Sequence, residues 1–277
     1  MVMNESAVLR FRRIGTITIA AVYFLILVGA IVRASGAGMG CPDWPTCFGQ
    51  WIPPTEESQL PPNYHEIYAE LGYAGTDFNP VKTWTEYINR LTGVTIGILI
   101  MVTVWRSRTI LKRDPPVFYA ALAALLLVMF QGWLGAVVVS SNLHPLMITM
   151  HMVLALAIVA LLIYAVARSQ KSHFARLHLH AISSRHFKLL GLILAMTLIQ
   201  IVLGAQVREA VDAIAKAMDY THREIWPTWL PWVFYLHRAF ALLVLCTNLV
   251  VIWQFIRFLP QNHLLFRLNL ILGLLVL

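Results

Sequence analysis

Long apolar segments alternate with shorter polar ones along most of this chain. A membrane crossing takes about 20 apolar residues in a helix, and several segments reach that length. These segments lie near 14–32, 87–105, 117–139, 146–167, 187–207 and 231–256. A further apolar segment begins near Phe266 and is still running at Leu277, so we expect an incomplete last helix there. The pattern predicts an all-α polytopic membrane protein.

Composition narrows the class of protein further. The chain has 277 residues, of which 59% are hydrophobic and 12% are charged. A soluble domain is nearer to about half apolar and about a quarter charged. The observed fractions therefore exclude an ordinary soluble domain, a disordered chain and a nucleic-acid-binding protein. The length allows about seven spans joined by short loops.

The distribution of charge predicts the orientation in the membrane. Most of the 21 lysines and arginines fall on one side, whereas only Glu5 and Asp114 of the 13 acidic residues share that side. Basic residues concentrate in cytoplasmic loops, so we expect a cytoplasmic N-terminus and place segments 35–86 and 207–230 outside. The first apolar segment is longer than that of a signal peptide, and we interpret it as a retained helix. The expected location is a bacterial-type cell membrane.

Two parts of the chain resemble each other at matching polar landmarks. The pattern Gly-Ala-x-Val-Arg closes two apolar segments, at 29–33 and 204–208. The pattern Tyr-x-(Asn or His)-Arg opens the apolar segments that follow, at 87–90 and 235–238. Chance similarity between apolar helices is the alternative, but two landmarks in the same order favour a parallel repeat. A repeat predicts two pseudo-symmetric four-helix bundles, with an eighth helix expected beyond Leu277.

The repeat also predicts the domain boundaries. We expect an N-terminal four-helix half over 1–168, which includes an outer loop at 34–85. A cytoplasmic linker over 169–186 then leads to an incomplete C-terminal half over 187–277.

A few ionisable and polar residues lie inside the predicted spans. Such residues are functional candidates because burying them without a partner costs several kcal/mol. Counted from the outer ends of their helices at about 1.5 Å per residue, they share one level, roughly 5–10 Å below the outer surface. These residues are Glu86, Asn89, Arg90, His151, His237 and Arg238.

These residue types suit a haem held between helices. Histidines on different helices of a four-helix bundle can ligate haem iron, which makes His151 and His237 candidate iron ligands. Arg90 and Arg238 lie beside the site and could pair with haem propionates. Two alternatives stay open. Both histidines could be hydrogen-bonded packing residues, and the small residues near them could form a close-packing seam.

Glu86 precedes Arg90 by four residues and shares a helix face with it, which allows two interpretations. Glu86 could be only the ion-pair partner of Arg90. Alternatively, a carboxyl group at a dry boundary could move protons in a reaction. The second interpretation makes Glu86 a candidate catalytic residue.

The first outer loop contains two of the three cysteines, Cys41 and Cys47. Thiols outside the cytoplasm are readily oxidised, so a disulfide between them is expected. The bridge could be purely structural, or it could cycle between oxidised and reduced states. The remainder of the loop, 55–85, is rich in Pro, Tyr and Glu and is expected to cover the outer face as a lid.

The assembled motifs resemble the heme A synthase family, whose members oxidise a methyl group of heme O to the formyl group of heme A. The resemblance covers nearly the whole chain. Its most specific parts are Gly-Ala-Gly-Met-Gly-Cys-Pro-Asp-Trp-Pro-x-Cys at 36–47 and Glu-Tyr-x-x-Arg at 86–90. By this resemblance, His237 ligates a resident heme b in the C-terminal half and His151 ligates the substrate haem in the N-terminal half.

The resemblance also implies residue roles and partners. Glu86 corresponds to the family glutamate implicated in catalysis, and Cys41 and Cys47 correspond to the outer-loop cysteine pair. The expected partners are the heme O substrate, membrane lipid, a heme O synthase, an electron donor and a second copy of the chain.

One position departs from the family pattern. Many members have a histidine where this chain has Asn89, and asparagine is a poor ligand of haem iron. The N-terminal site then has one strong ligand, His151, and an open side, which could suit oxygen activation or indicate a changed activity. Segment 207–230 also lacks a cysteine pair. The alternative function is a non-catalytic b-type cytochrome that passes electrons to a partner.

Overall fold

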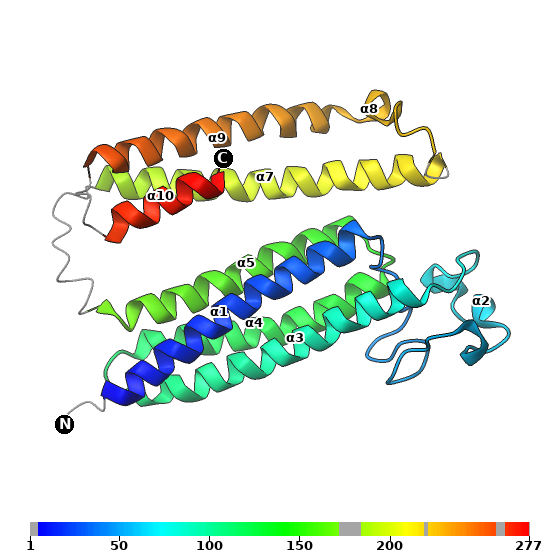
Figure 1. The fold of residues 1–277 in the computed structure, drawn as a ribbon, viewed down its shortest axis with the longest axis horizontal. Coiled ribbons are helices and arrows are strands. Elements are labelled where there is room, and N and C mark those ends of the chain that lie inside the picture. Colours follow the sequence, from blue (N-terminus) through cyan, green and yellow to red (C-terminus); the bar gives the residue numbers. More distant parts are fainter. Residues whose placement is uncertain (1–4, 172–183, 219–220, 259–263, 277) are drawn as a thin grey trace. The chain divides into compact units, whose positions relative to one another are not determined.

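The structure is a computed structural model, and it describes residues 5–171, 184–218, 221–258 and 264–276. These residues form helices joined by loops, and none of them forms a β-strand (Figure 1). Six of the described helices are long and apolar enough to cross a membrane. The prediction of an all-α polytopic membrane protein is therefore confirmed. The chain divides into two compact units, Met1–Phe174 and Ala175–Leu277.

Four long helices form a closed bundle in the first unit. They are α1 (Glu5–Ala34), α3 (Pro80–Ser107), α4 (Pro115–Ser140) and α5 (Pro145–Arg168). Each packs against two others, in the cyclic order α1, α3, α4, α5. Helices α3 and α5 therefore lie diagonally across the bundle. Three of the four begin with proline, which suits the first helical turn because an N–H would be unbonded there.

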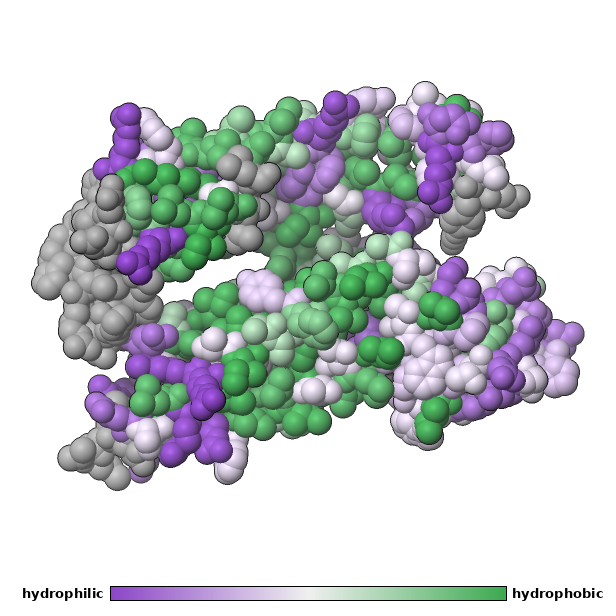
Figure 2. Space-filling view, in the orientation of Figure 1, coloured by the Kyte–Doolittle hydropathy of each residue, from purple (hydrophilic) through white to green (hydrophobic). Residues whose placement is uncertain are grey.

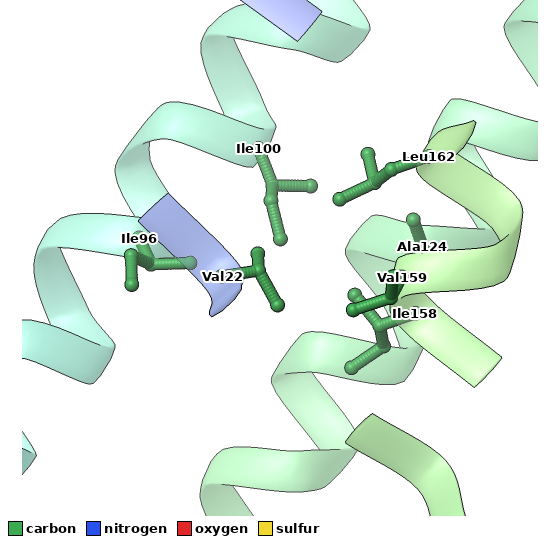
Figure 3. Packing of buried hydrophobic residues seen from close by; sticks show 7 residues of the cluster. All are labelled: Val22, Ile96, Ile100, Ala124, Ile158, Val159 and Leu162. Carbon is green, nitrogen blue, oxygen red and sulfur yellow. The ribbon is translucent and has the colours of Figure 1, made fainter. Parts of the chain in front are cut away.

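The interior of this bundle is built from small and branched apolar side chains that point toward one another (Figure 3). The cluster consists of Val22, Ile96, Ile100, Ala124, Ile158, Val159 and Leu162. Bulkier residues such as Phe24, Trp105 and Trp133 stay exposed on the outside. Figure 2 shows hydrophobic surface along these helices and hydrophilic residues toward their ends. This arrangement is typical of a bundle that lipid surrounds.

The second unit contains α7 (Ser184–Ala217), the short α8 (Trp226–Trp229), α9 (Trp232–Phe258) and α10 (Leu264–Val276). Helix α9 packs against both α7 and α10. The buried side chain of Asn269 donates from Nδ2 to the carbonyl of Ile252 at 2.8 Å, which fixes α10 on α9.

Helix α7 is longer than its apolar segment. It continues well past residue 207, and an ion pair at 3.0 Å between Arg208 and Asp212 supports the added turns. The predicted linker over 169–186 falls largely outside the described residues, and α7 already begins within it at Ser184.

The outer loop between α1 and α3 has a small aromatic core of its own. It includes the short elements η1 (Glu57–Gln59), α2 (Tyr64–Ile67) and η2 (Ala69–Leu71). Phe48 is 3% exposed and lies edge-on to four rings at centroid distances of 5.2–6.4 Å. These rings belong to Tyr64, Tyr68, Tyr73 and Phe78. The loop is therefore a folded substructure, in keeping with edge-on aromatic packing.

Candidate functional site

Glu86 and Arg90 lie one turn apart near the start of α3, where this helix meets the outer loop. Glu86 is 3% exposed. Its Oε1 accepts hydrogen bonds from Nε of Arg90 at 3.1 Å and from Nη2 of the same side chain. Its Oε2 accepts the backbone N–H of Cys41 at 2.8 Å. The ion pair expected from the spacing is present, and Glu86 also anchors the start of the disulfide ring.

Arg90 directs the rest of its guanidinium into the same ring. Its Nη1 donates to the carbonyls of Asp43 at 2.7 Å and Thr46 at 2.9 Å. Its Nη2 donates to the carbonyl of Cys41 at 3.2 Å. A guanidinium has five N–H donors, and all of them have protein acceptors here. Arg90 would have to release a contact before it could bind a propionate.

The disulfide between Cys41 and Cys47 is formed, and both residues are fully buried. Asp43, inside the ring, is a structural residue that sequence reasoning missed. Its Oδ1 accepts the N–H of Phe48 at 2.5 Å, and its Oδ2 accepts the N–H of Gly49 at 2.9 Å. Aspartate is common in loops because its side chain can bond to nearby backbone groups, and this general preference is the signal that the sequence offered for Asp43.

The loop approaches α3 so closely at Gly40 that no side chain would fit. A Cβ there would lie 2.4 Å from the carbonyl oxygen of Lys82. The Gly40 carbonyl accepts the hydroxyls of Thr83 at 2.8 Å and Tyr73 at 3.2 Å. Burial, with a smaller effect of the Glu86 charge, raises the pKa of Tyr73. The Tyr73 hydroxyl therefore remains a donor at neutral pH.

His151 lies on α5 and faces a glycine of α4. A Cβ on Gly135 would lie 3.6 Å from Cε1 of the imidazole. The Nε2 of Gln131, one turn before that glycine, donates to the carbonyl of His151 at 2.7 Å. The Nδ1 of His151 is buried and has no hydrogen-bond partner among the described residues. One buried ring nitrogen is therefore available to a ligand.

His237 repeats this arrangement in the second unit, between α9 and α7. A Cβ on Gly204 would lie 3.1 Å from Cε1 of the imidazole. The Nε2 of Gln200, again one turn earlier, donates to the carbonyl of His237 at 3.2 Å and lies 3.5 Å from its ring Nε2. The Nδ1 of His237 is buried without a partner in the described part of the chain.

Asn89 and Arg238 complete the set of predicted site residues. A Cβ on Gly29 of α1 would lie 3.9 Å from Oδ1 of Asn89, and this buried oxygen has no partner within the described ranges. Gly29 and Asn89 thus face each other as Gly204 and His237 do, at the matching positions of the repeat. Arg238 is exposed on α9.

The two half-buried histidines, His151 and His237, fit a haem. Across the described residues there is no group of three or more His, Cys, Asp and Glu side chains that could hold a bare metal ion. A haem needs only one or two protein ligands because the macrocycle supplies the others. His151 and His237 each offer, beside a glycine, a ring nitrogen that has no partner within the described part of the chain. Single histidines of this kind are sufficient for such a cofactor.

The fold and the site together define a class: an integral membrane protein of helices, with half-buried histidines between helix pairs. The family model described as cytochrome oxidase assembly protein (COX15-CtaA) matches residues 12–277. The chain belongs to this family, and the resemblance to heme A synthases is confirmed. No solved structure matches the chain.

Several relatives carry the name heme A synthase. The chain is 32% identical to one from Shewanella oneidensis over 154 residues, which are 56% of this chain and 44% of that protein. It is 32% identical to one from Shouchella clausii over 142 residues, 50% of this chain and 39% of that protein. It is 26% identical to one from Bacillus licheniformis over 245 residues, 83% of this chain and 70% of that protein. The first two matches thus cover less than half of those relatives.

Proposed function

We propose that this protein oxidises the methyl group of heme O to the formyl group of heme A. The methyl carbon is hydroxylated twice, and dioxygen or a membrane electron acceptor takes up the four electrons that this oxidation removes. The resulting gem-diol loses water to give the aldehyde. The observation that carries the proposal is a pair of imidazoles, one in each unit, whose buried Nδ1 has no hydrogen-bond partner among the described residues. Membership of a family whose similar members are named heme A synthase supports it.

Each unit is proposed to bind one haem. His151 holds the substrate haem in the first unit, and His237 holds a resident heme b in the second. When bound, the haems would supply the redox chemistry, including electron transfer. Arg238 is exposed beside His237 and is suited to a propionate. Arg90 is predicted to contact the substrate haem as well, and it can do so only by giving up one of its loop contacts.

Asn89 distinguishes the proposed haem site of the first unit, because many family members have a histidine at this position. It stands on α3, diagonal to the helix that carries His151, and its carboxamide is a weak ligand for iron. The substrate haem would then have one strong protein ligand and an open side. An amide there can donate a hydrogen bond to a small molecule or water on that side.

Glu86 is proposed to hold or move a proton during the oxidation. The N–H of Cys41 and the guanidinium of Arg90 both bond to its carboxylate. These donors stabilise negative charge on Glu86 and fix its oxygens in place. Its position beneath the disulfide ring links the proton-handling group to the conformation of the outer loop.

The orientation and partners are part of the same proposal. The N-terminus lies in the cytoplasm, and the sites lie near the outer leaflet of a bacterial-type cell membrane. A heme O synthase would deliver the substrate, and a membrane electron donor or acceptor would exchange electrons with the resident haem. Self-association of the protein is also proposed.

The test is to co-express the protein with a heme O source, extract the haems and look for the formyl derivative by mass spectrometry. Glu86→Gln, which keeps the size of the side chain, is expected to retain haem and lose the product. Folded, haem-loaded wild-type protein without the formyl product would contradict the proposal and favour a b-type cytochrome. Unchanged product yield in Glu86→Gln would remove only the role of Glu86.

A further inference from the structure

Each of the two site histidines, His151 and His237, is accompanied by a glutamine on the neighbouring helix. Gln131 precedes Gly135 by four residues on α4, and Gln200 precedes Gly204 by four residues on α7. Each glutamine donates from Nε2 to the backbone carbonyl of its histidine, at 2.7 Å in the first unit and 3.2 Å in the second. The same arrangement of glutamine, glycine and facing histidine therefore occurs in both units.

The remaining end of each carboxamide is buried and unused by the protein. The Oε1 of Gln131 and the Oε1 of Gln200 have no hydrogen-bond partner among the described residues, and the same holds for the histidine Nδ1 atoms. In the second unit the amide nitrogen Nε2 of Gln200, not its oxygen, lies 3.5 Å from the imidazole Nε2. Burying polar atoms without hydrogen-bond partners costs free energy. The grouping of such atoms around each histidine therefore indicates a site that a bound ligand would complete.

A third helix pair, α1 and α3 of the first unit, shows that this arrangement differs from ordinary helix packing. On α1, the residue four positions before Gly29 is Leu25, and the residue that Gly29 faces on α3 is Asn89. All three helix pairs have a glycine facing a polar residue, yet glutamine occurs only where that polar residue is histidine. Close packing alone explains the glycines and leaves the glutamines unexplained.

We propose that Gln131 and Gln200 are positioning residues for the haem-ligand histidines of their units. The amide N–H fixes the backbone of the histidine-bearing helix, and the glycine admits the imidazole beside the opposing backbone. The amide oxygen, which has no partner among the described residues, would accept a ring N–H of the histidine once haem is bound, and the other ring nitrogen would then be left for iron. Partners of this kind set the orientation and basicity of metal-bound histidines.

The first test is loss of haem affinity in the full chain. Gln131→Met and Gln200→Met keep side-chain length and remove the amide, and each is expected to lower haem affinity about ten- to a hundred-fold in its own unit. The reduction potential and the electron paramagnetic resonance signal of the affected haem are expected to shift, which a purely structural role would not cause. Gln206→Met, an exposed glutamine on α7, is the matched control. If the haem affinity, the reduction potential and the electron paramagnetic resonance signal all match those of this control, the proposal is overturned.

The second test introduces the arrangement of glutamine and histidine between α1 and α3, where the chain lacks it. Asn89→His supplies a histidine without its glutamine, and Leu25→Gln with Asn89→His supplies both. The double variant is expected to bind haem at least about ten-fold more tightly than Asn89→His alone, whereas Leu25→Met with Asn89→His gives no gain. Equal affinities of both double variants would contradict the proposal, even if the Gln131 and Gln200 variants fail to fold.

This inference rests on the proposed haem binding, and the two can fail separately. If His151→Ala and His237→Ala leave haem binding intact, the proposed function fails and the inference fails with it. If those variants lose haem but the glutamine variants match their control, only the inference fails.

Discussion

Helix α3 of the first unit and helix α9 of the second carry the same sequence landmark in different surroundings. On α3, Arg90 and Glu86 are bonded into a disulfide-closed ring. On α9, the position matching Arg90 is the exposed Arg238, and the position matching Glu86 is Phe234. Matching positions of a repeat have thus taken different roles: one arginine anchors a loop, and the other remains accessible to a ligand.

The comparison predicts opposite results for the two arginines. Arg90→Ala removes the ion-pair partner of the buried Glu86 and leaves several loop carbonyls without their donor. Breaking a buried ion pair costs about 3–5 kcal/mol. Arg238→Ala is expected to change stability by no more than about 0.5 kcal/mol, since exposed substitutions cost little. Thermal unfolding in detergent measures both. Equal losses of stability in the two variants would contradict the different roles of Arg90 and Arg238.

The disulfide is the next contribution that distinguishes the first unit. Cys41→Ser removes a bridge that closes a ring of sequence separation 6, and the chain-entropy contribution of such a ring is about 2–3 kcal/mol. We expect the outer loop to become sensitive to limited proteolysis while the bundle stays intact. Cys246→Ser changes the cysteine outside the bridge and serves as the control. Protease resistance equal to this control would show that Arg90 and Glu86 hold the loop by themselves.

The smallest expected effect concerns the Tyr73 hydroxyl. It donates to the carbonyl of Met39 at 2.7 Å, and Tyr73→Phe is expected to cost about 1 kcal/mol of loop stability. Because the pKa of Tyr73 is raised in the folded state, its contribution is complete below about pH 10, the unfolded value. It is lost as the pH rises above that value. Hydrogen exchange of the loop backbone, measured as a function of pH, reports this loss of stability. If the pH profile of Tyr73→Phe is identical to that of the wild-type protein, Tyr73 is not the cause of the pH dependence.

Patterns local in the sequence predicted the fold and part of the site. The apolar segments predicted the spanning helices, and the four-residue spacing predicted the ion pair of Glu86 and Arg90. The cysteines and their expected compartment predicted the disulfide. These features depend on helix periodicity and on chemistry that neighbouring residues specify.

Contacts between distant segments were not predictable in the same way. The bonds from Arg90 to the loop carbonyls of Asp43 and Thr46 depend on the loop path. The bond from Gln131 to His151 joins two helices, and sequence periodicity does not specify which partner a side chain meets across a helix pair. The four-residue step from glutamine to glycine was visible in the sequence, but only the facing histidines give it a meaning.

The most direct test of the account is the haem content of the purified full chain compared with His151→Ala, His237→Ala and the double variant. We expect that each single variant loses the haem of its own unit and keeps the other. The double variant should then lose haem absorbance altogether, while all variants retain their helical content. A double variant with the haem content of the wild-type protein would contradict the account.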